Sequence, residues 1–351
     1  MASNGNVTHG SDEEDSGGDQ LGHYCDLYYV YSQSLLDGPM WKAWLQFIVS
    51  FVLTTFGLAA NVISFVIMTF TKMRRHSYTV YLSALSLVDV GNVAQRLVVW
   101  LNLASLWFGG PQIVKPVNLA TSIVATYCSI TLAVQSSWLV SAISIERLIV
   151  VCFPVIGYRL CTRKAAIIIT VSTLLAAAVV MTYILMPSFE LEFHPIMGCY
   201  VGRKSQVTNT LISATFISIL PITLIIACNA SIIIALLRRK NLSESTNADP
   251  SERRKRASAL KVTKLLVALT TTLVICLTPA TIVLICMFLW PDFLWIRENL
   301  YGPVINILWE LNYGMNFVIY VFTSAEVRGY LACRGGSKHN TSSSQVFNYT
   351  S

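Results

Sequence analysis

Charged residues are scarce in this chain of 351 residues. Asp, Glu, Lys and Arg make up 12% of it, about half of their share in soluble domains, while hydrophobic residues make up 54%. Such a composition excludes an ordinary soluble domain and indicates a membrane protein. Seven stretches with few or no charges are long enough to cross a bilayer as helices. They comprise residues 43–71, 77–114, 116–145, 165–189, 205–237, 265–291 and 299–325.

Lysine and arginine are absent from residues 1–41, which contain seven acids. Bases cluster instead between alternate apolar stretches, around residues 72–75, 159–164, 238–240 and 253–256. Because cytoplasmic loops are rich in lysine and arginine, this pattern predicts a multi-pass plasma-membrane protein with an extracellular N-terminus and a cytoplasmic C-terminus. The basic clusters flank spans and lack interleaved aromatic residues, which argues against a nucleic-acid partner.

An apolar core typical of signal peptides is missing from the first 40 residues, so the first span is expected to act as the insertion signal. We divide the chain into a mostly disordered extracellular tail (1–41), a helical bundle (42–322), a short amphipathic helix (323–333) and a cytoplasmic tail (334–351). Asn6, in Asn6-Val7-Thr8, is a glycosylation acceptor on the outer side. Cys333 is a candidate for palmitoylation, with an unmodified frayed tail as the alternative.

No charge occurs from Pro116 to Ile145, and then Glu146 and Arg147 follow side by side. A helix of these thirty residues is about 45 Å long, so the pair lies at one face of a membrane whose apolar core is about 30 Å thick. An ionised pair there is costly unless protein shelters it, which points to a function. The alternative is a simple stop-transfer charge, but the apolar run continues beyond the pair.

Other polar residues interrupt the apolar stretches. Asp89 lies about 18 Å from the end of its span, where a carboxylate costs on the order of 3 kcal/mol unless it has a partner such as Asn61. Arg96 follows on nearly the same helix face. Pro221 and Pro279 are expected to kink the fifth and sixth spans. The seventh stretch is unusually polar, with Asn306, Glu310, Asn312, Asn316 and Tyr320.

These residues occur in an order that resembles the rhodopsin-like (class A) G protein-coupled receptors, from about Leu45 to Cys333. The matching features are Asn61, LSALSLVD ending at Asp89, Glu146-Arg147, Pro221, Cys276-Leu277-Thr278-Pro279 and Asn316-Phe317-Val318-Ile319-Tyr320. The Asn-Phe-Val-Ile-Tyr and Ser-Ile-Glu-Arg forms look like invertebrate neuropeptide receptors of the FMRFamide type. The resemblance implies an all-α membrane protein, a seven-helix bundle followed by a short cytoplasmic amphipathic helix.

The resemblance also implies roles for particular residues. The G protein switch is expected at Glu146, Arg147, Pro221, Pro279, Asn316 and Tyr320. Asp89, Ser136, Asn312 and Asn316 are expected to form a sodium-like pocket, with Na⁺ as the possible metal and a polar network without an ion as the alternative. Leu148, Asn229, Leu277 and Phe317 depart from the family pattern. Ala259 stands where many members have an acid, which leaves the resting lock to Glu146 alone and favours raised basal activity.

The cysteine that usually caps the third span of this family is absent, since Ser122 occupies its position. Cys199, in an outward-facing loop, is expected to pair with Cys25 or with Cys128, and disulfide geometry requires Cα atoms within about 7 Å. Cys128 is the preferred partner if its helix begins irregularly.

We expect an extracellular neuropeptide as ligand, a heterotrimeric G protein as intracellular partner, membrane lipid around the bundle, and no catalytic residue. The acidic and aromatic outer segments suit a cationic or amidated peptide, and a receptor for a non-peptide ligand is the alternative. The expected pocket is lined by Arg96, Thr126, Ser129, Ile130, Ala133, Ala280, Thr281, Leu284, Asn306 and Glu310.

Three other classes of membrane protein each require a feature that this sequence lacks. An opsin needs a lysine in the seventh span, where Glu310 stands instead. A seven-helix transporter would show internal repeats, and an intramembrane enzyme would show a His or Asp pair at one depth. The sequence contains neither pattern.

Overall fold

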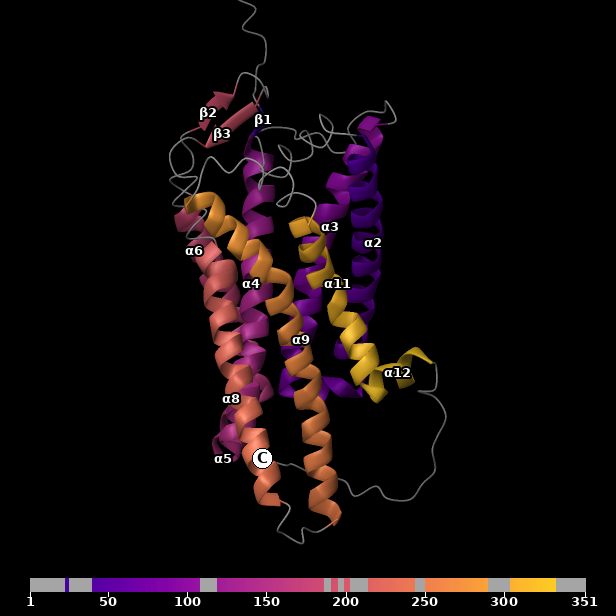
Figure 1. Cartoon of the computed structure of the whole chain (residues 1–351), viewed down its shortest axis with the longest axis vertical. Helices are drawn as coiled ribbons and strands as arrows, with labels where there is room; N and C mark the ends of the chain where they lie inside the picture. The colour runs from indigo at the N-terminus through magenta and orange to yellow at the C-terminus, as the bar shows by residue number, and fades with distance from the viewer. Residues whose placement is uncertain are drawn as a thin grey trace, which may run out of the picture.

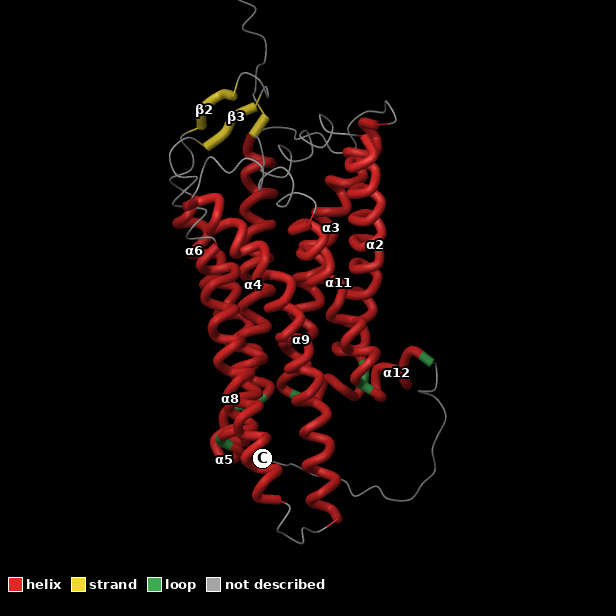
Figure 2. Tube along the Cα trace, viewed as in Figure 1, coloured by secondary structure: helices red, strands yellow, loops and turns green. Residues whose placement is uncertain are grey.

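The computed structural model describes residues 23–24, 40–107, 119–185, 191–194, 199–202, 214–243, 250–289 and 304–332. These residues form a bundle of long helices with a small sheet at one end (Figure 1, Figure 2). The long helices are α2 (Met40–Phe70), α3 (Ser77–Trp107), α4 (Leu119–Cys152), α6 (Arg163–Leu185), α8 (Leu220–Ser243), α9 (Pro250–Leu289) and α11 (Asn306–Thr323). The short helices are η1 (Lys72–Arg75), α5 (Pro154–Leu160), the π-helical η3 (Thr215–Ile219) and α12 (Ala325–Leu331).

Six of the described helices are long and apolar enough to cross a membrane. Their spanning segments are Trp44–Phe70, Ser77–Leu101, Tyr127–Cys152, Arg163–Tyr183, Thr215–Arg238 and Val262–Ile282. They fall on the first six apolar stretches of the sequence, which confirms the prediction of a helical membrane bundle. The third span runs on to Cys152 and thus contains Glu146 and Arg147. α11 lies in the seventh stretch of the sequence. Its buried Asn and Glu side chains make it more polar than the six helices above, so it is not counted among them.

Three short strands at one end of the bundle were not predicted from the sequence. β2 (Leu191–His194) and β3 (Cys199–Gly202) pair antiparallel, and β1 (His23–Tyr24) pairs parallel with β3, so that the strand order is β1-β3-β2. The sheet therefore joins the N-terminal tail to the connection between α6 and α8.

α12 is attached to the end of α11 by side-chain hydrogen bonds. The hydroxyl of Ser324 accepts a hydrogen bond from the backbone N–H of Val327, which caps the N-terminus of α12. Arg328 Nη1 donates to the carbonyls of Val321 and Phe322, each at 2.9 Å, at the C-terminus of α11. These bonds satisfy backbone groups that have no partner within a helix, because α11 ends and α12 begins there. Figure 1 shows α12 turning away from the axis of α11.

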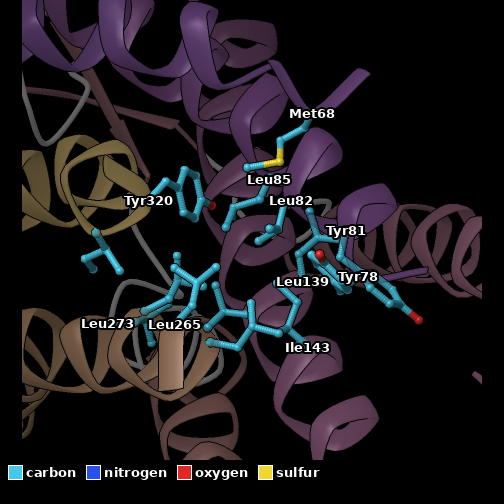
Figure 3. Close-up of a cluster of buried hydrophobic side chains, with 14 of the residues drawn as sticks. Met68, Tyr78, Tyr81, Leu82, Leu85, Leu139, Ile143, Leu265, Leu273 and Tyr320 are labelled. Carbon is cyan, nitrogen blue, oxygen red and sulfur yellow. The ribbon is translucent and has the colours of Figure 1, made fainter. Parts of the chain in front are cut away.

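The main hydrophobic core surrounds α3. Leu82 and Leu85 of α3 are fully buried and belong to one cluster with Leu139 of α4, Leu265 of α9 and Tyr320 of α11 (Figure 3). Lipid tails are as apolar as leucine, so close packing rather than exclusion of water holds such helices together in a bilayer. α3 is therefore in a position to support polar groups from several neighbouring helices.

α2 and α11 approach each other through two glycines. A Cβ atom on Gly57 would lie 3.6 Å from the Cα of Gly314, so the two backbones are in near contact. Small residues allow this proximity in membrane bundles. At this contact Asn61 Nδ2 donates to the carbonyl of Tyr313 at 2.9 Å, which fixes α11 against α2.

Candidate functional site

Glu146 and Arg147 form a buried ion pair near the end of α4. Arg147 Nη2 lies 2.7 Å from Glu146 Oε1. The glutamate is 6% exposed and the arginine 8% exposed. Charges removed from water in this way are costly unless neighbouring groups satisfy them, so the surroundings of the pair decide how firmly it is held.

α3 supplies two further partners of this pair. Ser77 Oγ donates to the same Oε1 of Glu146 at 2.7 Å, and the Arg147 guanidinium lies 5.0 Å from the centre of the Tyr78 ring. A hydrogen bond to a charged group contributes about 1.5–3 kcal/mol. Arg147 therefore contacts Tyr78 as well as Glu146, and Ser77 supports the pair through Glu146. The sequence analysis missed Ser77 and Tyr78, whose one signal is their position at the start of a span.

Asp89 is fully buried in the middle of α3 and accepts two hydrogen bonds. Ser136 Oγ of α4 donates to Oδ1, and Asn316 Nδ2 of α11 donates to Oδ2, both at 2.8 Å. The structure thus brings together three of the four residues of the predicted sodium-like pocket. Asn312, the fourth, is buried one turn earlier on α11.

Asn61 does not satisfy Asp89, so that suggestion from the sequence is wrong. Its side-chain amide donates to the carbonyls of Gly57 and Tyr313, each at 2.9 Å. The physical reason is the close approach of α2 and α11, which places a backbone acceptor of α11 within reach of Asn61. In the described ranges no group of three or more His, Cys, Asp or Glu side chains gathers. A cation at Asp89 would therefore depend on hydroxyl and amide oxygens, which suit a hard ion.

Arg96 and Glu310 belong to a third buried cluster, between α3 and α11. Glu310 is 1% exposed, and its Oε1 accepts a hydrogen bond from Trp100 Nε1 at 3.0 Å. The Arg96 guanidinium lies 5.1 Å from the centre of the Trp309 ring, next to Glu310 in the sequence, and 5.8 Å from that of Tyr313. Sequence reasoning found the two charges but missed Trp100, because an aromatic residue in an apolar helix carries no signal of its polar bond.

The other predicted pocket residues lie on α4, α9 and α11. Asn306 is buried one turn before Glu310. Thr281 is buried, and its hydroxyl donates to the carbonyl of Leu277 within α9 at 2.9 Å, next to the buried Ala280. Half-buried residues on α4 are Ser129, Ile130 and Ala133. The side chains of Thr126 and Leu284 lie outside the described part of the structure.

Pro221 follows the π-helical turn η3 at the start of α8. Trp138 Nε1 of α4 donates to the carbonyl of Phe216 within this turn at 3.0 Å. A π turn leaves backbone groups displaced from the regular ladder, and the indole satisfies one of them. In α9, Pro279 lacks the N–H that would bond to the carbonyl of Ile275. Both prolines therefore mark places where a helix deviates from regular hydrogen bonding.

α8 and α9 are joined by a bond that the sequence analysis did not anticipate. Asn229 Nδ2 donates to Thr270 Oγ1 at 2.9 Å, and both residues are buried. Asn229 stands where the receptors that this sequence resembles commonly have a tyrosine. Tyr320, the last residue of the predicted switch, is 1% exposed in the core beside α3.

The structure describes the predicted covalent sites only in part. Cys128, the preferred partner of Cys199, is a half-buried free thiol. Cys199 begins β3, opposite His23 of β1, and Cys25 follows β1 outside the described residues. The glycosylation acceptor Asn6 and the palmitoylation candidate Cys333 also lie outside them.

The three buried polar clusters follow one another along α3. Ser77 and Asp89 are about 18 Å apart along the helix axis, and Asp89 and Trp100 about 16 Å. Each cluster joins α3 to α4, to α11 or to both. A movement of α3 against these helices therefore alters polar contacts at both ends of the bundle, which is what a transmembrane switch requires.

Comparison with protein families agrees with this arrangement. The model of the 7 transmembrane receptor (rhodopsin family) matches residues 60–320, well over half of the chain, and the match includes all three clusters. A comparison with curated proteins gives no match. Members of the matched family are membrane receptors that transmit signals, not enzymes. The chain is therefore a multi-pass membrane receptor and belongs to the rhodopsin family of seven-transmembrane receptors.

Proposed function

We propose that the protein is a receptor of the plasma membrane that is activated by an extracellular neuropeptide and signals through heterotrimeric G proteins. The observation that carries this proposal is the buried ion pair of Glu146 and Arg147, which Ser77 and Tyr78 hold inside the bundle. A sheltered arginine at the end of a span is a group that a partner can engage once the helices separate.

The proposal assigns α11 as the seventh span and places α12 at the cytoplasmic face as an amphipathic helix, with Cys333 palmitoylated just beyond it. The N-terminal tail is then extracellular and carries a glycan on Asn6. A disulfide joins Cys199 to Cys25. Support for this pairing comes from the strand register, which puts Cys199 opposite His23, and from the free thiol of Cys128.

Activation in this proposal is a shift between two conformations. A ligand that binds one of them better shifts the population toward it. In the resting conformation Arg147 faces Glu146 and Tyr78. Movement of α9 about Pro279 exposes Arg147 to the G protein, and the hydrogen bond of Asn229 with Thr270 makes α8 follow α9.

The proposed ligand is a basic or amidated peptide of the FMRFamide type. Seven acids occur in residues 1–41, and β1 attaches this tail to the loop that carries Glu192. Inside the bundle, Glu310 offers a buried carboxylate whose Oε2 makes no hydrogen bond among the described residues. A guanidinium or amide group of the ligand satisfies this oxygen. A non-peptide ligand with a basic group is the second candidate, favoured by the same carboxylate.

A screen of amidated peptides on cells that express the receptor, read by calcium and cyclic-nucleotide signals, tests the proposal. We expect an agonist from this screen.

The Arg147→Ala variant should keep surface expression and agonist affinity within a few fold but lose signalling, because Arg147 lies at the end of the bundle opposite to the ligand. The control is Arg74→Ala, which removes an exposed base from η1. Normal signalling by Arg147→Ala would contradict the proposed switch, and activation by non-peptide compounds alone would exclude a peptide ligand.

We further propose that Na⁺ binds at Asp89 in the resting conformation. Sodium should then raise the melting temperature of the purified receptor above that in choline of equal ionic strength, because a ligand of the folded state stabilises it. The Asp89→Asn variant keeps groups that can bond to Ser136 and Asn316 but loses the charge, so its melting temperature should be the same in both salts. An equal sodium effect in the two proteins would favour a polar network without an ion.

Replacement of Glu310 by Gln tests its contact with the ligand. The amide retains an acceptor for Trp100 Nε1, so surface expression should remain normal. Loss of a hydrogen bond to a charged group costs about 1.5–3 kcal/mol, so the potency of a basic agonist should fall at least about tenfold. An analogue of the agonist without its basic residue is the control and should be unaffected. Equal losses for both peptides would show that Glu310 has a structural role only.

A further inference from the structure

A groove lies on the outer surface of the bundle where α4 ends beside α8. It has a volume of about 390 Å³ and is lined by Cys152, Ser231, Ile234, Ala235 and Arg238. The four residues of α8 are spaced at i, i+3, i+4 and i+7, so they form one stripe along the helix. This stripe is about 10 Å long, with an apolar middle and a cationic end.

The groove faces away from the part of the bundle that holds Arg147. Asn229 contacts α9 through Thr270, and Ser231 lies about 200° further around α8. Ser231, Ile234 and Arg238 are exposed. These side chains therefore face the surroundings of the bundle and not the space between α4, α8 and α9, so the groove is separate from the proposed G protein site.

The depth of the groove places it at the edge of the membrane. Cys152 is the last residue of one spanning segment and Arg238 the last residue of another. Exposed bases also occur at the end of α5 and the start of α6, namely Arg159, Arg163 and Lys164. Figure 1 shows α5 and the C-terminal half of α8 at the same end of the bundle. An apolar slot with a base at one end, at a membrane surface that carries further bases, complements an amphiphile with a negative head.

We propose that this groove binds an anionic phospholipid of the cytoplasmic leaflet, with its phosphate at Arg238 and the first part of an acyl chain along Ile234 and Ala235. The assignment to the cytoplasmic leaflet rests on the orientation given under the proposed function. Basic clusters beside spans attract anionic lipids by about 1 kcal/mol for each charge. Diacylglycerol, which has acyl chains but no phosphate, fits the same slot but leaves Arg238 without its counter-charge.

The test uses the full-length receptor in non-ionic detergent and measures saturable binding of labelled phosphatidylserine and of labelled diacylglycerol. Arg238→Gln should weaken phosphatidylserine binding about fivefold and leave diacylglycerol binding unchanged. Arg74→Gln is the matched control, because it removes an exposed base that does not line the groove, in η1 between α2 and α3. Ser231→Phe fills the slot and should lower the binding of both lipids, with the melting temperature as the check on folding.

Three results would overturn the proposal. Equal losses from Arg238→Gln and Arg74→Gln would show attraction to the overall surface charge. Unchanged binding by Ser231→Phe would exclude the groove. Displacement of the label by glycerophosphoserine as effectively as by the intact lipid would indicate a site for soluble phosphates. The assay needs neither agonist nor G protein, so its failure leaves the proposed receptor function standing, and a failed peptide screen leaves the lipid site standing.

Discussion

A charge inside a bilayer must be satisfied by protein groups, and this constraint organises the bundle around α3. In the part of the chain that the structure describes, carboxylates are buried at three depths, those of Glu146, Asp89 and Glu310. One of them belongs to α3, and each of the other two accepts a hydrogen bond from an α3 side chain. Because all three carboxylates are buried in the protein, displacement of α3 removes a hydrogen bond from at least one of them. The polar contacts therefore couple the two ends of the bundle, while the apolar core around Leu82 and Leu85 provides the packing.

The ion pair near the end of α4 has more neighbouring groups that stabilise it than the sequence suggests. Ala259 lacks the charge to hold Arg147 from α9, so the resting state was expected to depend on Glu146 alone. In the structure the hydroxyl of Ser77 orients Glu146, and the ring of Tyr78 covers the guanidinium. Conformational states of a receptor differ by a few kcal/mol, and a hydrogen bond to a charged group contributes about 1.5–3 kcal/mol. One hydroxyl is therefore enough to set the resting population.

Sequence reasoning worked where a regular period or a scarcity of charge carried the information. The length of the apolar runs located the spans, and the resemblance to a receptor family placed Ser136 beside Asp89. It failed for partners that are distant in sequence and ordinary in type. Trp100 and Glu310 are 210 residues apart, and nothing local marks the indole as a donor. The bond from Asn61 to the Tyr313 carbonyl depends on the glycine contact of α2 with α11, which a pattern in one helix does not reveal.

The Ser77 hydroxyl holds the ion pair in its resting arrangement, and ligand-independent signalling reports this contribution. Ser77→Ala should raise basal G protein activation at least about tenfold at equal surface expression, because the resting state loses one hydrogen bond to a charge. Ser83→Ala on the same helix, which removes a 3.3 Å hydrogen bond with Thr69 remote from any charge, should leave basal activation unchanged. Basal signalling by Ser77→Ala equal to that of Ser83→Ala would contradict the account.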